Sequence, residues 1–197
     1  MIIWTSKAAL LAAAVLGLGA CDGIQTAGFL GGLSVATSAP EESVALAQTQ
    51  MANGAFTLVP PRGFCIDKNT LRQNFALMAR CDVLGAPDRA GGAPVGIITV
   101  SVTALKDDAS LPTPEQVADA AKLARISAEK SQSRAITFRA EGAPPAAGLD
   151  AKHWRGVAQI GDRLMGIALY GPKGARAVSS EGREVINDLI RQTHEGG

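Results

Sequence analysis

Short runs in which apolar and polar residues alternate are the feature that most constrains the fold of this chain of 197 residues. A period of two is typical of strands that bury one face of a sheet. In residues 97–105, Ile98, Val100 and Val102 alternate with Thr99 and Ser101, as in an antiparallel sheet with one covered face. Comparable runs occupy residues 56–59, 63–67, 75–84, 135–139, 152–160 and 163–170.

Two stretches carry the signals of helices. Thr113 is a candidate N-cap, Pro114 takes the first helical position and Gln116 completes the spacing of a capping box. Small apolar residues then recur at helical spacing, which predicts a helix from Pro114 to about Lys130. A second helix is predicted over residues 179–193, where an apolar stripe is expected to be buried. That stripe consists of Val185, Ile186, Leu189 and Ile190.

The resulting order is four strands, a helix, three strands and a helix. This order predicts an α+β fold, with a mainly antiparallel sheet of about six to seven strands packed with two helices. We expect residues 51–197 to form this single globular domain. Gly161 and Asp162 are expected to connect the last two strands as a two-residue hairpin loop.

The first residues have the plan of a secretory signal. Lys7 carries the one charge, and an uncharged run from Ala8 to Ala20 ends on small residues. The run is shorter than the roughly 20 apolar residues that a membrane span needs. Residues 1–20 are therefore expected to be a signal peptide. Three alternatives stay open: a cleaved signal in which Cys21 has no role, an uncleaved anchor, and a retained helix of a cytoplasmic protein.

The stretch Leu18-Gly19-Ala20-Cys21 resembles the lipobox of bacterial lipoproteins. This resemblance implies that Cys21 becomes the N-terminus after cleavage and carries lipid, palmitate included. More than one acyl chain gives stable membrane attachment. In the enterobacterial lipoproteins that it resembles, an acidic residue at the position of Asp22 favours the inner membrane. We therefore expect a protein anchored to the membrane and facing the periplasm, with the inner membrane favoured.

Residues 21–50 are expected to form a flexible, lipid-anchored tether, because they are rich in Gly, Ala, Ser and Thr. Ser43 to Gln50 are expected to add at most a short helical turn. The chain has 19 basic and 18 acidic residues. Such a balance leaves no electrostatic footprint for nucleic acid, and a local cluster such as His153 with Arg155 is a weak signal.

The opening of the domain reads Phe56-Thr57-Leu58-Val59-Pro60-Pro61-Arg62-Gly63-Phe64. This succession of strand, proline, glycine and aromatic resembles the opening of PsbP-like domains, which are found in the extrinsic photosystem II subunit and in bacterial lipoproteins. The order of elements fits that family over roughly residues 54–193. The resemblance implies a non-catalytic module that docks on a membrane assembly, and it assigns no functional residues.

Cys65 and Cys81 are the cysteines that follow Cys21. A disulfide between them fits an oxidising periplasm. The alternation opposes it, because Cys81 falls on the core side of its strand whereas Cys65 faces outward. A bulge or an irregular start at Gly63 would reconcile the two, so we expect the bridge, and two separately buried thiols are the alternative.

Other residues give weaker signals. His153 and His194 lie far apart and no Cys-x-x-Cys spacing exists, so we expect neither a metal nor a cofactor. His153 is interpreted as a residue on the surface of a strand. Ser127 and Lys130 have the Ser-x-x-Lys spacing of penicillin-recognising enzymes, but the companion motifs are absent. The remaining candidates are carboxylates interpreted as solvent-facing or turn residues. They are Asp67, Asp82 and Asp88.

These observations predict a lipid-anchored cell-envelope protein that acts as a non-catalytic binding or assembly module, within an envelope protein complex. The alternative is a small envelope hydrolase or thiol-redox protein that uses Cys65 or His153. An enzyme needs a concave pocket with convergent polar groups and shifted pKa values. An adaptor would instead expose a large apolar patch.

Overall fold

The computed structural model describes residues 43–106 and 110–195. The predicted signal peptide, Cys21, Asp22 and most of the predicted tether lie outside these residues. The strands are β1 (Ala45–Leu46), β2 (Thr49–Met51), β3 (Phe56–Leu58), β4 (Phe64–Asp67), β5 (Phe75–Arg80), β6 (Ile97–Ala104), β7 (Ala124–Gln132), β8 (Ala135–Glu141), β9 (Lys152–Ile160), β10 (Arg163–Tyr170) and β11 (His194–Glu195). The α-helices are α1 (Pro114–Ala121) and α2 (Ser180–Gln192), and short 3-10 helices are η1 (Cys81–Leu84), η2 (Pro87–Arg89) and η3 (Arg176–Val178).

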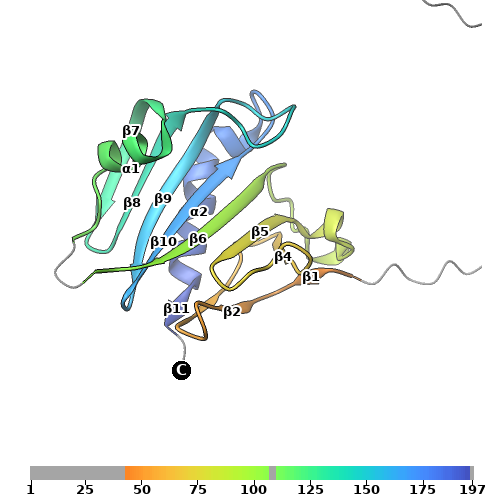
Figure 1. Cartoon of the computed structure of the whole chain (residues 1–197). Coiled ribbons are helices and arrows are strands. Elements are labelled where there is room, and N and C mark those ends of the chain that lie inside the picture. The colour runs from red at the N-terminus through yellow and green to blue at the C-terminus, as the bar shows by residue number, and fades with distance from the viewer. Residues whose placement is uncertain (1–42, 107–109, 196–197) are drawn as a thin grey trace, which may run out of the picture. The chain divides into compact units, whose positions relative to one another are not determined.

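Within the described residues, eight strands form one sheet in the order β1-β4-β5-β6-β10-β9-β8-β7, and three form a smaller sheet in the order β11-β3-β2 (Figure 1). Neighbouring strands run antiparallel in both sheets, and β9 and β10 are joined by the expected hairpin. The α+β class with a large antiparallel sheet and two helices is confirmed. The predicted six to seven strands are too few for the large sheet, because β1 and β7 were not expected, and β3, which was expected in that sheet, lies in the smaller one.

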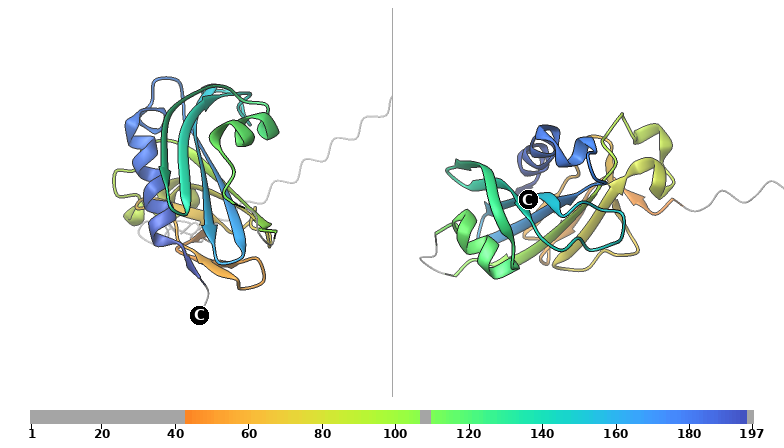
Figure 2. Two further views of the ribbon diagram at one scale, coloured as in Figure 1. Left: turned by 90° about the vertical axis from the view of Figure 1, so that its left-hand side faces the viewer. Right: turned by 90° about the horizontal axis from the view of Figure 1, so that it is seen from above.

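The two helices lie on opposite faces of the large sheet (Figure 2). The face toward α2, which we call the α2 face, holds the larger core. On this face β6 contributes Ile98 and Val100, β10 contributes Met165 and Leu169, and α2 contributes Ile186; all are fully buried. The opposite face, which we call the α1 face, carries a smaller cluster around Phe138. The inward residues of β6 are those that the alternation predicted.

Two glycines let α2 lie close to the sheet. A Cβ on Gly182 of α2 would lie 1.9 Å from the carbonyl oxygen of Ala177 and 2.5 Å from Cδ1 of Trp154. A Cβ on Gly156 of β9 would lie 2.8 Å from Cγ2 of Ile186. The indole Nε1 of Trp154 donates a hydrogen bond of 2.6 Å to the carbonyl oxygen of Ser179, just before α2. The start of the helix is therefore held directly against the strand.

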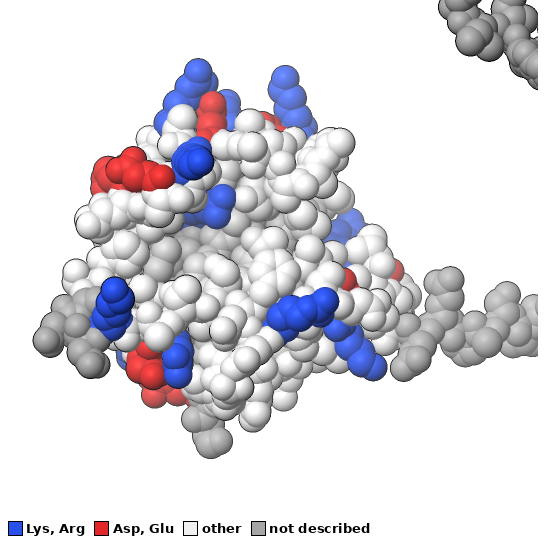
Figure 3. Space-filling model, in the orientation of Figure 1, with Lys and Arg blue, Asp and Glu red and all other residues white. Residues whose placement is uncertain are grey.

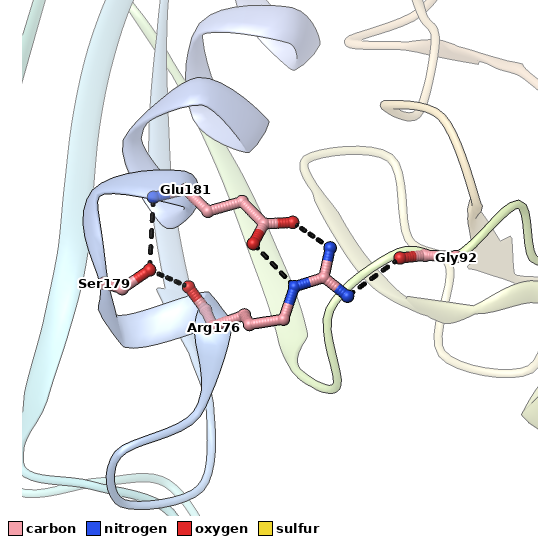
Figure 4. A network of polar contacts seen from close by, with 4 residues as sticks. All are labelled: Gly92, Arg176, Ser179 and Glu181. Atoms are coloured by element: carbon pink, nitrogen blue, oxygen red, sulfur yellow. Dashed lines mark hydrogen bonds and ion pairs between the residues drawn. The ribbon is translucent and has the colours of Figure 1, made fainter.

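An arginine joins the start of α2 to a distant loop (Figure 4). Nε of Arg176 donates to Oε2 of Glu181 at 2.7 Å, and its Nη1 donates to the carbonyl oxygen of Gly92 at 3.2 Å. Oγ of Ser179 accepts from the backbone N–H of Glu181 at 3.2 Å and caps the helix. The loop before β6 is thereby attached to the N-terminal turn of α2.

The helix predicted over residues 114–130 is correct only at its start. The capping box of Thr113 and Gln116 is present, but α1 ends at Ala121. Lys122 has a φ of 53° and is the C-cap in the left-handed region. Its N–H and that of Leu123 bond back to the last turn of the helix, which closes it.

Residues 124–132 form β7 instead of continuing the helix. They pair with β8, with two register shifts, and Arg125 and Ala128 have positive φ values of 50° and 54°. Alanine-rich sequence favours a helix only weakly, and tertiary contacts override that preference. Here the pairing with β7 gives the backbone N–H and C=O groups of β8 hydrogen-bond partners along that edge. Ser127 and Lys130 thus lie on a strand with irregular pairing.

The chain before residue 51 also differs from the expectation. Residues 45–46 and 49–51 are the strands β1 and β2, not a helical turn. Strand β1 pairs with β4, and β2 pairs with β3. The folded part of the chain therefore begins before residue 51, and the predicted tether boundary is placed too late.

With Cys81 on the core side of residues 75–84, alternation predicts that Phe75 and Leu77 face inward too, and this facing is inverted in the structure. Ala76 and Met78 are buried on the α2 face, whereas Phe75 on the α1 face is 37% exposed. The alternation is ambiguous because both faces of β5 carry apolar residues, and the pairing of Met78 with Ile98 decides which is inward. The strand also ends at Arg80.

The expected bridge between Cys65 and Cys81 is present, with a Cα–Cα distance of 4.9 Å. Cys65 pairs with Ala79 and so lies on the α1 face of β4. Cys81 follows β5 directly as the first residue of η1. Its N–H bonds to the carbonyl oxygen of Gly63 at 3.0 Å. The obstacle to the bridge disappears because the facing of β5 is inverted, so that its odd-numbered residues lie on the α1 face, as Cys65 does.

We expect replacement of both bridged cysteines by serine to lower the free energy of unfolding by about 3 kcal/mol, because the bridge closes a loop of 16 residues. Urea unfolding of the oxidised chain and of the double variant measures the change. Unfolding of the wild-type chain in reductant is the control. An unchanged midpoint in both comparisons would contradict the expectation.

Gly63 has a φ of +81°, which favours glycine, and it also has no room for a side chain. A Cβ there would lie 2.2 Å from the carbonyl oxygen of Ala90. Gly148 is a matched control, because its φ is +83° and nothing lies within 4 Å of an added Cβ. We expect Gly63→Ala to destabilise the domain by about 1–3 kcal/mol more than Gly148→Ala, since only the former adds a steric clash. Thermal and urea unfolding of the two variants check the difference.

Candidate functional site

A groove lies on the α1 face beside the helix. Helix α1 packs on β7 and β8, where Val117 and Leu123 contact the cluster of Ile136, Phe138 and Val157. Beyond this contact, a groove of about 400 Å³ lies between α1 and strands β6, β9 and β10. In the view of Figure 3, the centre of this face is hollowed and mostly uncharged, and charged side chains gather toward its margins.

Small side chains on both walls explain why the groove is open. The sheet contributes Ser101 from β6 with Gly166 and Ala168 from β10, and the helix contributes Ala120 and Ala121. A Cβ on Gly166 would already lie 3.0 Å from Oγ of Ser101. The space between helix and strands is therefore not filled by the chain itself.

Arg155 is the charged residue of the groove, and it is held in place by two aromatic side chains. Its Nε donates to Nε2 of His153 at 2.9 Å, and its Nη2 donates to Oη of Tyr170 at 2.9 Å. The rings of His153 and Tyr170 stack with their centroids 4.5 Å apart. Nδ1 of His153 lies 2.8 Å from the carbonyl oxygen of Ala151. This network assigns the proton to Nδ1 and leaves Nε2 as the acceptor.

The charge of Arg155 is not balanced by the residues around it. Among residues 43–106 and 110–195, no carboxylate forms an ion pair with Arg155. Burial lowers the pKa of Arg155, an effect that Tyr170 opposes. Burial also lowers the pKa of His153; the hydrogen bond to Ala151 opposes this, and the charge of Arg155 adds to it. The groove therefore contains one cation whose two partners are neutral.

The interpretation of His153 as a surface residue is wrong, because the side chain is 0% exposed. Sequence reasoning paired His153 with Arg155 only as a weak cluster and did not single out Tyr170. The hairpin register was the available signal. It pairs Leu169 with Trp154, which brings Tyr170 next to His153 and both onto the face of Arg155.

The predicted carboxylates lie at the surface, in local contacts. Oδ1 of Asp67 accepts from the backbone N–H of Asn69 at 2.9 Å, as expected for a turn residue. Asp82 pairs with Arg80, whose hydrogen bond lowers the pKa of that carboxyl group. Asp88 lies in η2. In the described part of the chain, no three His, Cys, Asp or Glu residues are arranged to hold a metal ion.

No helix within residues 43–106 and 110–195 combines the length and apolar character required to cross a membrane.

Comparison with known proteins gives likenesses of structure only. No protein-family model and no curated protein matches the chain. The Ran-binding protein Mog1p of Saccharomyces cerevisiae has a TM-score of 0.48 and 15% identity, over 75% of this chain and 93% of that one. A point mutant of Mog1 has a TM-score of 0.47 and 15% identity, over 75% and 94%.

The cyanobacterial PsbP (CyanoP) of Synechocystis has a TM-score of 0.44 and 12% identity, over 85% of this chain and 98% of that one. The structural neighbours thus include a member of the group that residues 56–64 resemble. At these identities and TM-scores, we transfer no function from any of these proteins.

The buried His153 makes the stability of the domain depend on pH. Because its pKa in the folded state is lowered from 6.5, the unfolded state binds the proton more tightly. The contribution of neutral His153 to the stability is therefore complete at pH values above about 6.5 and is lost as the pH falls below that value. We expect His153→Gln to flatten the decline in the free energy of unfolding between about pH 7 and pH 5. Urea unfolding across this range measures the slope, and His194→Gln provides the reference for loss of an exposed histidine. A slope in His153→Gln equal to the wild-type slope would contradict this cause.

Proposed function

We propose that this chain is a lipid-anchored, non-catalytic binding module of the cell envelope, which faces the periplasm and binds its ligand in the groove beside α1. The observation that carries the proposal is the chemistry of the lining. Among the described residues that line the groove, Arg155 is the one with an ionisable side chain. The hydroxyl groups of Ser101 and Thr99 therefore have no general base beside them within the groove. Such a lining suits binding and positioning.

The residues named by the enzyme alternative do not favour it. Cys65 and Cys81 are bridged to one another and are 1% and 2% exposed, so neither sulfur is accessible for exchange. Both ring nitrogens of His153 are engaged, by Ala151 and by Arg155. Its lone pair at Nε2 is directed at a guanidinium and not at a nucleophile. We therefore propose binding as the single function.

The envelope location is supported by the sequence. The lipobox-like stretch Leu18–Cys21 favours lipid attachment, and Asp22 favours the inner membrane. The balance of 19 basic and 18 acidic residues argues against nucleic acid as the partner. The resemblance of residues 56–64 to PsbP-like domains favours an envelope protein complex as the place where the module acts.

Lipid attachment is tested on the chain produced in a bacterial host. We expect mass spectrometry to find residues 1–20 removed and acyl chains on Cys21, and we expect the product to partition into detergent. Each buried methylene of such chains contributes about 0.8 kcal/mol to membrane binding. Cys21→Ser should abolish both the added mass and the partitioning.

The double variant Cys65→Ser, Cys81→Ser is the matched control, because it loses cysteines and keeps Cys21. It should remain acylated. An unmodified Met1 at the N-terminus of the wild-type product would overturn the proposed location.

A further inference from the structure

We propose that the groove binds a small amphipathic carboxylate, with the carboxylate on the guanidinium of Arg155 and the apolar body between α1 and the sheet. This inference rests on the proposed function, in that the site binds its ligand and does not transform it.

The position of Arg155 favours an anion. The guanidinium is partly buried, and its two hydrogen bonds end on the neutral acceptors Nε2 of His153 and Oη of Tyr170. A charge that is withdrawn from water without a counter-charge is costly, and an anionic ligand would remove that cost. The guanidinium has five N–H donors, so donors remain at Nη1 and Nη2 for a bidentate contact with a carboxylate.

The arginine is held ready for such a contact. His153 fixes Nε from one side and Tyr170 fixes Nη2 from the other, while both rings are stacked on one another. All three residues come from the paired strands β9 and β10, not from loops. Binding would therefore immobilise little that is not already fixed, which favours affinity.

Part of the lining fits an apolar body. Val117 and Ala120 of α1 and Val157 and Leu164 of the sheet give the groove its apolar side chains, beside the hydroxyl groups of Thr99 and Ser101. A volume of about 400 Å³ is in the range of small-molecule sites and too small for a folded partner. A single cation matches a monoanion better than a phosphate dianion. These features point to a carboxylate with an apolar chain of about six to ten carbon atoms.

The test uses hexanoate, hexylammonium and 1-hexanol as probes, and the full chain reconstituted in lipid nanodiscs. Isothermal titration calorimetry, with empty nanodiscs subtracted, compares their affinities. We expect hexanoate to bind and hexylammonium not to bind. Arg155→Gln should weaken hexanoate at least ten-fold, and Arg155→Lys should weaken it less. Arg62→Gln is the matched control, because Arg62 is an exposed arginine outside the groove, and it should retain wild-type affinity.

A second variant tests the groove if Arg155→Gln does not fold, as judged by circular dichroism. Ala120 is exposed on α1 and lines the groove, so Ala120→Trp fills the space without adding volume to the core. It should abolish hexanoate binding. Retained hexanoate affinity in Ala120→Trp, equal binding of hexanoate and hexylammonium, or no binding of hexanoate at all would each overturn the inference.

The outcomes separate this inference from the proposed function. If 1-hexanol binds as tightly as hexanoate, and Ala120→Trp abolishes both while Arg155→Gln changes neither, the groove remains a binding site and only the carboxylate is wrong. Lipid attachment at Cys21 is measured independently of any ligand, so its absence overturns the envelope location and leaves the chemistry of the groove untouched.

Discussion

The contact between Trp154 and the start of α2 determines the roles of the two faces of the sheet. The indole fills the space that Gly182 leaves open and donates its hydrogen bond to Ser179. Because neighbouring residues of a strand point to opposite faces, this fixed position of Trp154 directs His153 and Arg155 to the other face. Strand β9 therefore contributes side chains to the core on one face and to the groove on the other.

The two faces also differ in chemistry. The α2 face is closed by large apolar side chains from β6, β10 and α2, which supply most of the buried core. The α1 face is only partly covered, and small residues such as Gly166 and Ala120 keep it open. The larger core and the groove thus lie on opposite faces of the same strands, so changes in the groove need not disturb that core.

Local patterns predicted the elements that are held by contacts between residues close in sequence. The bounds of β9 and β10 and the turn between them followed from alternation and from Gly161-Asp162, and the start of α1 followed from its capping box. The end of α1 at Ala121 did not follow, because residues 124–132 pair with β8, and a local pattern does not contain that tertiary contact. The groove depends on where that helix stops, so it could not be foreseen. The cluster of His153, Arg155 and Tyr170 could have been found by extending the hairpin register to the end of β10.

The two outer strands of the large sheet restrict how the domain can meet other proteins. Strand β1 offers only two residues, and β7 is interrupted by two register shifts and by residues with positive φ. Such borders are poor templates for adding a further strand from another chain. Copies of the domain at high local concentration would consequently resist joining edge to edge through the large sheet into fibrils.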